Sequence, residues 1–148
     1  MADGLKNTNP KDALGIKKVP FTTIPWTVLA ELGVAMMEGA MKYGKHNYRS
    51  IGVRASVYID AANRHMSSFW EGEDLDPDSR LSHVTKAIAS LVVLRDGMIS
   101  NNWVDDRPLK APAGWMAAMN ERVAELLVQY PNPVLPFVQI DTTWTEEK

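Results

Sequence analysis

Apolar residues recur at helical spacing in four segments of the chain, residues 25–43, 55–70, 77–99 and 115–129. In the first segment, Leu29, Leu32 and Met36 follow one another at intervals of three and four, which places them on one face of a helix. Pro25 suits the first turn of that helix, and Gly44 suits its end. The spacing predicts further inward positions at Tyr58, Ala62, His65 and Phe69, at Leu81, Val84, Ile88, Leu91, Val92 and Arg95, and at Met119, Val123 and Leu126. Four helices with little strand signal predict an all-α fold, a helical bundle.

The segments before and after the helices differ from them in composition. Residues 1–23 are polar and rich in Gly, Asn, Lys and Pro, which predicts an extended arm. The tail contains three prolines and is predicted to lie over the surface, with one short strand over residues 134–140. We therefore expect a single domain over residues 1–148, with an arm (1–23), a helical core (24–130) and a Pro-rich tail (131–148).

Composition narrows the class of protein. A length of 148 residues fits one compact domain, and a net charge of −2 gives no indication of non-specific nucleic-acid binding. The absence of cysteine excludes disulfides and thiolate metal sites. There is no secretory leader and no apolar run that could span a bilayer, so we expect a cytoplasmic protein with no membrane partner. Five Trp and eight Met are many apolar side chains for four short helices to bury, which predicts a homo-oligomer.

An acidic turn lies between the second and third predicted helices. Glu73, Asp74 and Asp76 stand close together there, and His83 follows. Clustered carboxylates repel one another unless a cation holds them, so these four residues are candidate metal ligands. The alternative is helix capping, in which Asp76 is an N-cap before a proline; it leaves Glu73 and Asp74 unexplained.

Three charged residues share one face of the first predicted helix. Glu31, Glu38 and Lys42 are separated by seven and four residues, and both spacings return to the same side of a helix. Glu31 or Glu38 could bind a metal, and Lys42 could bind phosphate. The alternative is a solvated face with a surface ion pair between Glu38 and Lys42.

The loop after this helix combines cations, amides and aromatic rings. It could grip a triphosphate and support a base, or it could be a polar connection whose aromatic rings complete the core. Its candidate binding residues are Lys42, Tyr43, Asn47 and Arg49. Further along the chain, Arg64 and His65 could face the acidic turn, where Arg64 could hold phosphate. The alternatives are an Arg64 pair with Asp60 and a hydrogen-bonded core histidine at His65.

An ordered set of motifs over residues 8–95 resembles the phage dATP/dGTP diphosphohydrolases, which are related to the MazG-like all-α nucleotide pyrophosphohydrolases. The set consists of the arm segment Thr8-Asn9-Pro10-Lys11-Asp12, the block from Glu31 to Arg49, and Arg64-His65 with the acidic turn and His83. Within that group of enzymes the motifs resemble the MazZ enzymes of phages that replace adenine by 2-aminoadenine in their DNA. The resemblance implies a dimer or a dimer of dimers and a need for Mg²⁺ or Mn²⁺. It also implies cleavage of a purine deoxynucleoside triphosphate, dATP or dGTP, to the monophosphate and pyrophosphate, in the host cell that the phage infects.

The resemblance also suggests a mechanism. Two or three divalent ions would lie between Glu31 or Glu38 and the acidic turn with Glu73, Asp74, Asp76 and His83. Glu38 would accept the proton of the attacking water, and Lys42 and Arg64 would act on the phosphates. The residues expected to bind substrate are Asn9, Lys11, Lys42, Tyr43, Asn47 and Arg49. MazG-like enzymes carry Glu-x-x-Glu and Glu-x-x-Asp; this chain has the second pattern twice and the first nowhere.

Two other functions fit the same pattern. A pyrimidine triphosphate pyrophosphatase acting on dUTP or dCTP would share the fold, and a panel of triphosphates separates it from a purine enzyme. A non-enzymatic helical interaction module would bind a protein partner through its Trp- and Met-rich surface. Such a module would show no metal-dependent thermal shift.

Overall fold

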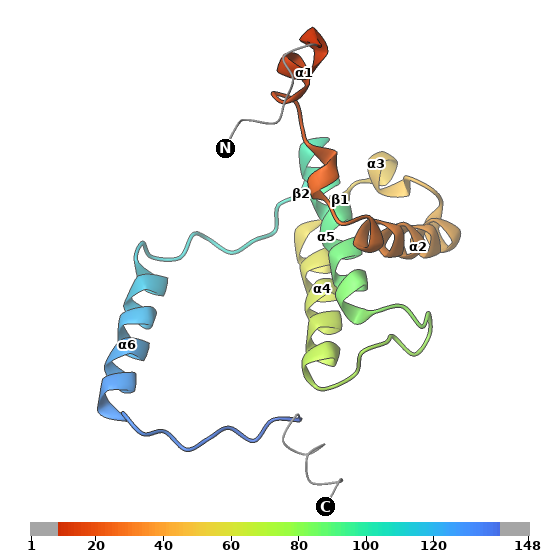
Figure 1. Ribbon diagram of the computed structural model, residues 1–148. Helices are drawn as coiled ribbons and strands as arrows, with labels where there is room; N and C mark the ends of the chain where they lie inside the picture. Colours follow the sequence, from red (N-terminus) through yellow and green to blue (C-terminus); the bar gives the residue numbers. More distant parts are fainter. Residues whose placement is uncertain (1–8, 140–148) are drawn as a thin grey trace, which may run out of the picture. The chain divides into compact units, whose positions relative to one another are not determined.

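The computed structural model describes residues 9–139, and helices dominate it (Figure 1). The elements are α1 (Pro10–Gly15), a 3₁₀ turn (Phe21–Thr23), α2 (Trp26–Tyr43), α3 (Asn47–Ile51), β1 (Val53–Arg54), α4 (Ala55–Trp70), α5 (His83–Ile99), β2 (Trp103–Val104) and α6 (Trp115–Gln129). The all-α fold class is confirmed. The chain forms two compact units, Met1–Arg107 and Pro108–Lys148, and α6 is the helix of the second.

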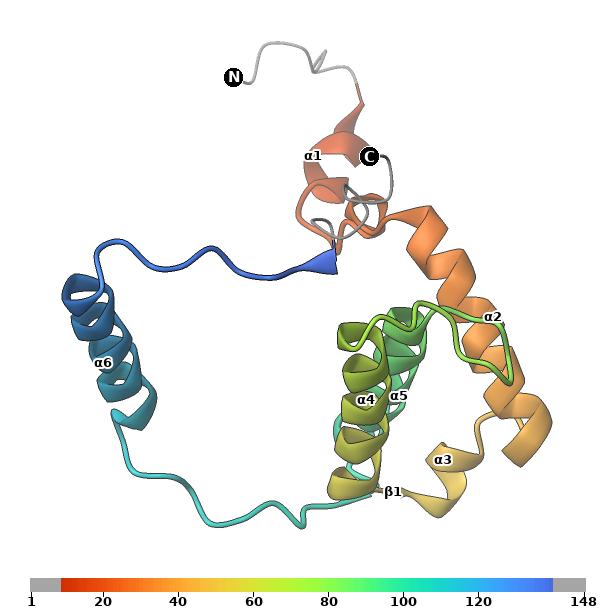
Figure 2. The same cartoon turned by 90° about the horizontal axis from the view of Figure 1, so that it is seen from below.

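The first unit is organised around α5. This helix packs against α4 and α2, and Figures 1 and 2 both show α4 and α5 side by side. Strands β1 and β2 pair in parallel, with Val53 opposite Trp103. The core cluster consists of Val53, Ala55 and Leu94, with Tyr48, Tyr58, Val93, Met98 and Trp103 packed against it. No helix within residues 9–139 is long and apolar enough to cross a membrane.

The predicted start of the third helix is wrong. Helix α5 begins at His83 rather than at residue 77, and Ser82 occupies its N-cap position. The expected cap, Asp76, instead accepts hydrogen bonds from the backbone N–H groups of Asp78 (3.0 Å) and Ser79 (2.9 Å). A bridge between Leu75 and Ser82 closes this turn, so its residues cannot continue the helix.

The arm and the tail also differ from the prediction. Within the expected extended arm, Pro10–Gly15 is helical, because the side chain of Asn9 caps the helix and Pro10 supplies its first residue. The expected loop from Gly44 to Arg54 contains α3 and β1. No strand forms over residues 134–139, and residue 140, where the predicted strand ends, lies outside the described part.

The buried residues of α5 are not the ones predicted to face inward. The buried positions are His83, Thr85, Ala87, Leu94 and Gly97. Two predicted inward residues, Leu91 and Val92, are 45% and 36% exposed in the single chain. In α6 no residue is buried, so the predicted burial of Met119, Val123 and Leu126 is also wrong for the single chain.

Gly97 marks the closest approach of α5 to β1. A Cβ atom there would lie 2.6 Å from Cγ2 of Val53, a core side chain. We expect Gly97→Ala to lower the free energy of unfolding by about 1–3 kcal/mol, because a close-packed core resists an added methyl group. Urea unfolding measures the change. Gly39→Ala is the matched control in α2, where nothing lies within 4 Å of the added Cβ, and it should not destabilise the protein.

Candidate active site and metal cluster

A histidine–aspartate cluster joins α4, the acidic turn and α5. Nδ1 of His65 lies 2.9 Å from Nδ1 of His83 and 4.0 Å from Oδ2 of Asp76. One ligand atom from each residue falls within 4.8 Å of the others. His83 and Asp76 are 3% and 9% exposed. Imidazole nitrogen and carboxylate oxygen are ligands for divalent first-row metals, so this cluster could hold a metal ion.

Glu73 contacts the cluster through His83. Its Oε2 lies 3.1 Å from Nε2 of His83, while Nδ1 of the same ring faces His65. An Nε2–H that donates to this carboxylate leaves Nδ1 of His83 without a proton and able to bind a metal. Burial, the charge of Lys86 and neighbouring His83 lower the pKa of His65, which favours the neutral imidazole that metal binding requires.

Lys86 connects the cluster to α2 and was not among the predicted site residues. Its Nζ lies 3.1 Å from Oε2 of Glu38, 3.5 Å from Oδ2 of Asp76 and 3.2 Å from Oγ of Ser79. A signal was present, since Lys86 stands one helical turn after His83 and therefore on the same face of α5.

Glu38 is bound by two lysines. Lys42 contacts Oε1, as the predicted surface pair requires, while Lys86 contacts Oε2. The hydrogen bond from Lys42 lowers the pKa of Glu38 below its usual range, against the effect of burial, and Lys86 lowers it further. A carboxylate with a lowered pKa is a weak proton acceptor, so this geometry favours a positioning role for Glu38.

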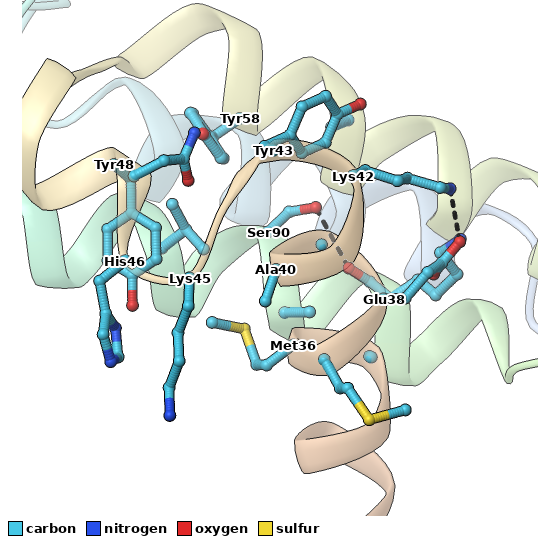
Figure 3. Close-up of a pocket in the computed structure, with 18 of the residues that line it drawn as sticks. Met36, Glu38, Ala40, Lys42, Tyr43, Lys45, His46, Tyr48, Tyr58 and Ser90 are labelled. Carbon is cyan, nitrogen blue, oxygen red and sulfur yellow. Dashed lines mark hydrogen bonds and ion pairs between the residues drawn. The ribbon is translucent and has the colours of Figure 1, made fainter.

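A pocket of about 800 Å³ opens beside this network, between α2, α3, α4 and α5 (Figure 3). Of the predicted site residues, five line it: Glu38, Lys42, Tyr43, Asn47 and Arg64. Lys86 and His65 line it as well, and His65 therefore belongs to both the pocket wall and the metal cluster. Tyr48 and Tyr58 add aromatic surface, and Figure 3 shows Lys42 reaching toward Glu38.

Comparison with known proteins identifies the family. The family model described as "dATP/dGTP diphosphohydrolase, N-terminal" matches residues 8–107. The chain belongs to this family. The match ends at Arg107, where the first compact unit ends, and it includes every element that borders the pocket. Membership indicates an enzyme that acts on nucleoside triphosphates. No curated protein and no solved structure matches the chain.

Two other predicted site residues have partners away from the pocket. Glu31 accepts a hydrogen bond from the hydroxyl of Thr85 at 2.8 Å. Arg49 donates two hydrogen bonds to Asp96, at 2.8 and 2.7 Å, which ties α3 to α5. Neither Glu31 nor Arg49 is among the described residues that line the pocket.

The candidates from the arm and the exposed part of the turn also lie off the pocket wall. The side chain of Asn9 accepts a hydrogen bond from the backbone N–H of Lys11 (3.0 Å) and so caps α1. Asp74 contributes its backbone carbonyl to the N–H of His83 at 3.0 Å. None of Asn9, Lys11 and Asp74 is among the described residues that border the pocket.

The charge of Asp76 should stabilise the metal-free protein. Burial alone would raise the pKa of Asp76, but hydrogen bonds from Ser79 and Asp78 and the charge of Lys86 lower it from 3.8 to about 2. Because the pKa is lower in the folded state, the stabilisation is present above pH 3.8 and is lost as the pH falls toward 2. We expect Asp76→Asn to cost about 2 kcal/mol at neutral pH. Urea unfolding in EDTA across this pH range measures the free energy of unfolding of both proteins. The difference between the variant and the unsubstituted protein should become smaller as the pH falls.

Proposed function

We propose that the pocket is the active site of a metal-dependent diphosphohydrolase that converts dATP and dGTP to the monophosphate and pyrophosphate. The observation that carries this proposal is the double position of His65, in the metal cluster and in the pocket wall. Lys42, Arg64 and Lys86 border the same pocket. A metal ion and three cations could therefore meet one triphosphate, as the charge of that group requires.

The donor set of the cluster suits Mn²⁺ better than Mg²⁺. Two imidazole nitrogens and one carboxylate oxygen form the set, whereas Mg²⁺ prefers oxygen ligands alone. We therefore propose Mn²⁺ as the better activator and Mg²⁺ as the weaker one. When bound, the ion would neutralise phosphate charge and lower the pKa of a bound water.

The side chains around the pocket have separate roles in this proposal. Lys42, Arg64 and Lys86 would hold phosphate oxygens and stabilise the negative charge of the leaving pyrophosphate. Glu38, bound to both lysines, would keep their ammonium groups in place. Glu73 would hold the His83 ring in its metal-binding orientation.

The base would occupy the aromatic part of the pocket. Tyr43 and Tyr48 can stack on a purine ring, and the amide of Asn47 can bond to its edge. The family description supports the purine preference. The resemblance to the enzymes of phages with 2-aminoadenine DNA supports a role in shaping the nucleotide pool of an infected cell.

The exposed apolar side chains support a homodimer or homotetramer. In the described chain no large side chain is fully buried, while Leu91 and Val92 on α5 and Phe69 on α4 are more than a third exposed. A second copy would cover such surfaces. Sedimentation equilibrium measures the state, and a monomer at micromolar concentration would contradict this part of the proposal.

A panel of triphosphates tests the substrate. We expect turnover of dGTP and dATP with Mn²⁺, and much lower kcat/KM for dCTP and dUTP. Preference for dCTP or dUTP would instead identify the pyrimidine enzyme. No turnover of any triphosphate with Mn²⁺ or Mg²⁺ would leave the interaction module as the better description.

A further inference from the structure

We propose that the ammonium group of Lys86 takes the place of a second metal ion, so that each site holds a single divalent ion at the histidine–aspartate cluster. The sequence pattern led to an expectation of two or three ions between the acids of the first helix and those of the turn. The role of Lys86 toward triphosphate rests on the proposed function. The metal count rests only on the contacts of the side chains.

Lys86 lies between an acid of α2 and an acid of the turn, where the sequence pattern led us to expect a shared ion. Its Nζ contacts three oxygens, Oε2 of Glu38 at 3.1 Å, Oδ2 of Asp76 at 3.5 Å and Oγ of Ser79 at 3.2 Å. These oxygens come from α2 and from the turn, the two segments whose acids were expected to share metal ions. The side chain of Lys86 is 15% exposed, so its charge is held in place rather than free in solvent.

Glu38 on α2 is already paired with two lysines, and Glu31 is hydrogen-bonded to α5. Oε1 of Glu38 is bound by Lys42 and its Oε2 by Lys86, so both oxygens have a cationic partner. Oε2 of Glu31 accepts a hydrogen bond from Thr85. A divalent ion between Glu38 and Asp76 would compete with the ammonium group for the same oxygens and would be repelled by it.

Oδ2 of Asp76 is shared between the cluster and Lys86, and the two histidines supply the other ligand atoms of the cluster. The Nδ1 atoms of His65 and His83 face each other at 2.9 Å and make no contact with Lys86 among the described interactions. Lys86 also lines the pocket, so its charge can meet a phosphate group. The ammonium group of Lys86 would thus be a fixed positive charge beside one exchangeable metal ion.

Counting Mn²⁺ in the full chain without nucleotide tests the inference. Equilibrium dialysis should give one Mn²⁺ per chain for the unsubstituted protein. Lys86→Met, which removes the charge and keeps a similar length, should open a second site, raise the count to two and produce the spin-coupled electron paramagnetic resonance signal of neighbouring Mn²⁺ ions. Lys42→Met is the matched control, because Lys42 binds Glu38 but does not contact Asp76, and its count should stay at one.

Two results would overturn the inference. One is a count other than one in the unsubstituted protein, and the other is a folded Lys86→Met protein whose count stays at one. If Lys86→Met does not fold by circular dichroism, the count in the unsubstituted protein decides. One bound Mn²⁺ per chain without triphosphate turnover would contradict the proposed function but agree with the inferred metal count. Turnover of purine triphosphates with two bound Mn²⁺ per chain would agree with the proposed function and contradict the inferred metal count.

Discussion

Asp76→Asn is expected to lower kcat for dGTP by about a thousandfold. The substitution keeps an oxygen that can accept the turn hydrogen bonds from Asp78 and Ser79, but it removes the charge that faces His65 and Lys86. Loss of one charged ligand weakens metal binding, and metal-ion catalysis contributes several kcal/mol to phosphate chemistry. Steady-state kinetics with Mn²⁺ measures the change.

Asp78→Asn is the control for this prediction. Asp78 lies in the same turn, but its side chain is exposed and does not belong to the metal cluster. We expect kcat to stay within about twofold of the unsubstituted value, because an exposed charge is screened by solvent. A folded Asp76→Asn enzyme with nearly full activity would contradict the placement of the metal.

Arg64→Met is expected to lower kcat/KM by about 10–100-fold. Arg64 lines the pocket, its side chain is exposed, and the predicted pair with Asp60 is not among the ion pairs of the described residues. Its guanidinium group is therefore available to a phosphate. A hydrogen bond to a charged group contributes about 1.5–3 kcal/mol, which gives the expected range.

Arg122→Met provides the comparison for Arg64. Arg122 lies on α6 and pairs with Glu125 at 2.8 Å, both side chains being well exposed. Its replacement should leave kcat/KM and the free energy of unfolding nearly unchanged, since exposed pairs contribute little. Equal losses of kcat/KM in both variants would argue against a specific phosphate contact at Arg64.

Local patterns predicted three of the long helices well, while the short helices α1 and α3 were missed. Helices α4 and α6 begin and end at the predicted residues, and α2 differs by one residue at its start. Helical periodicity depends on neighbours three and four residues apart, which a sequence displays directly. The start of α5 was missed because the turn around Asp76 is closed by hydrogen bonds to Asp78, Ser79 and Leu81, which outweigh the Asp-Pro capping signal.

The candidate site was predicted only in part, because its contacts join distant segments. The acidic turn and His83 suggested a metal, and the cluster that could hold one contains Asp76 and His83. For His65 the sequence left two positions open, the core and the side that faces the acidic turn. The contact with His83, 18 residues away, corresponds to the second. Lys86 contacts Glu38 of α2 and Asp76 of the turn, and these contacts exist only in the folded chain.

Helix faces were harder to predict than helix bounds. Gly97 and Ala87 are buried on α5, whereas the large apolar Leu91 and Val92 remain exposed in the single chain. Hydrophobicity predicts that a face is covered but does not say whether the cover comes from the same chain. The family match, which ends at Arg107, likewise leaves the second unit with α6 outside the matched residues.

The most direct test of the account is the set of products formed from dGTP by the purified chain with Mn²⁺, and again with EDTA. We predict dGMP and pyrophosphate in equal amounts with Mn²⁺, and neither product once EDTA has removed the metal. Release of inorganic phosphate with dGDP, of triphosphate with deoxyguanosine, or of the same products in EDTA would contradict a metal-dependent diphosphohydrolase.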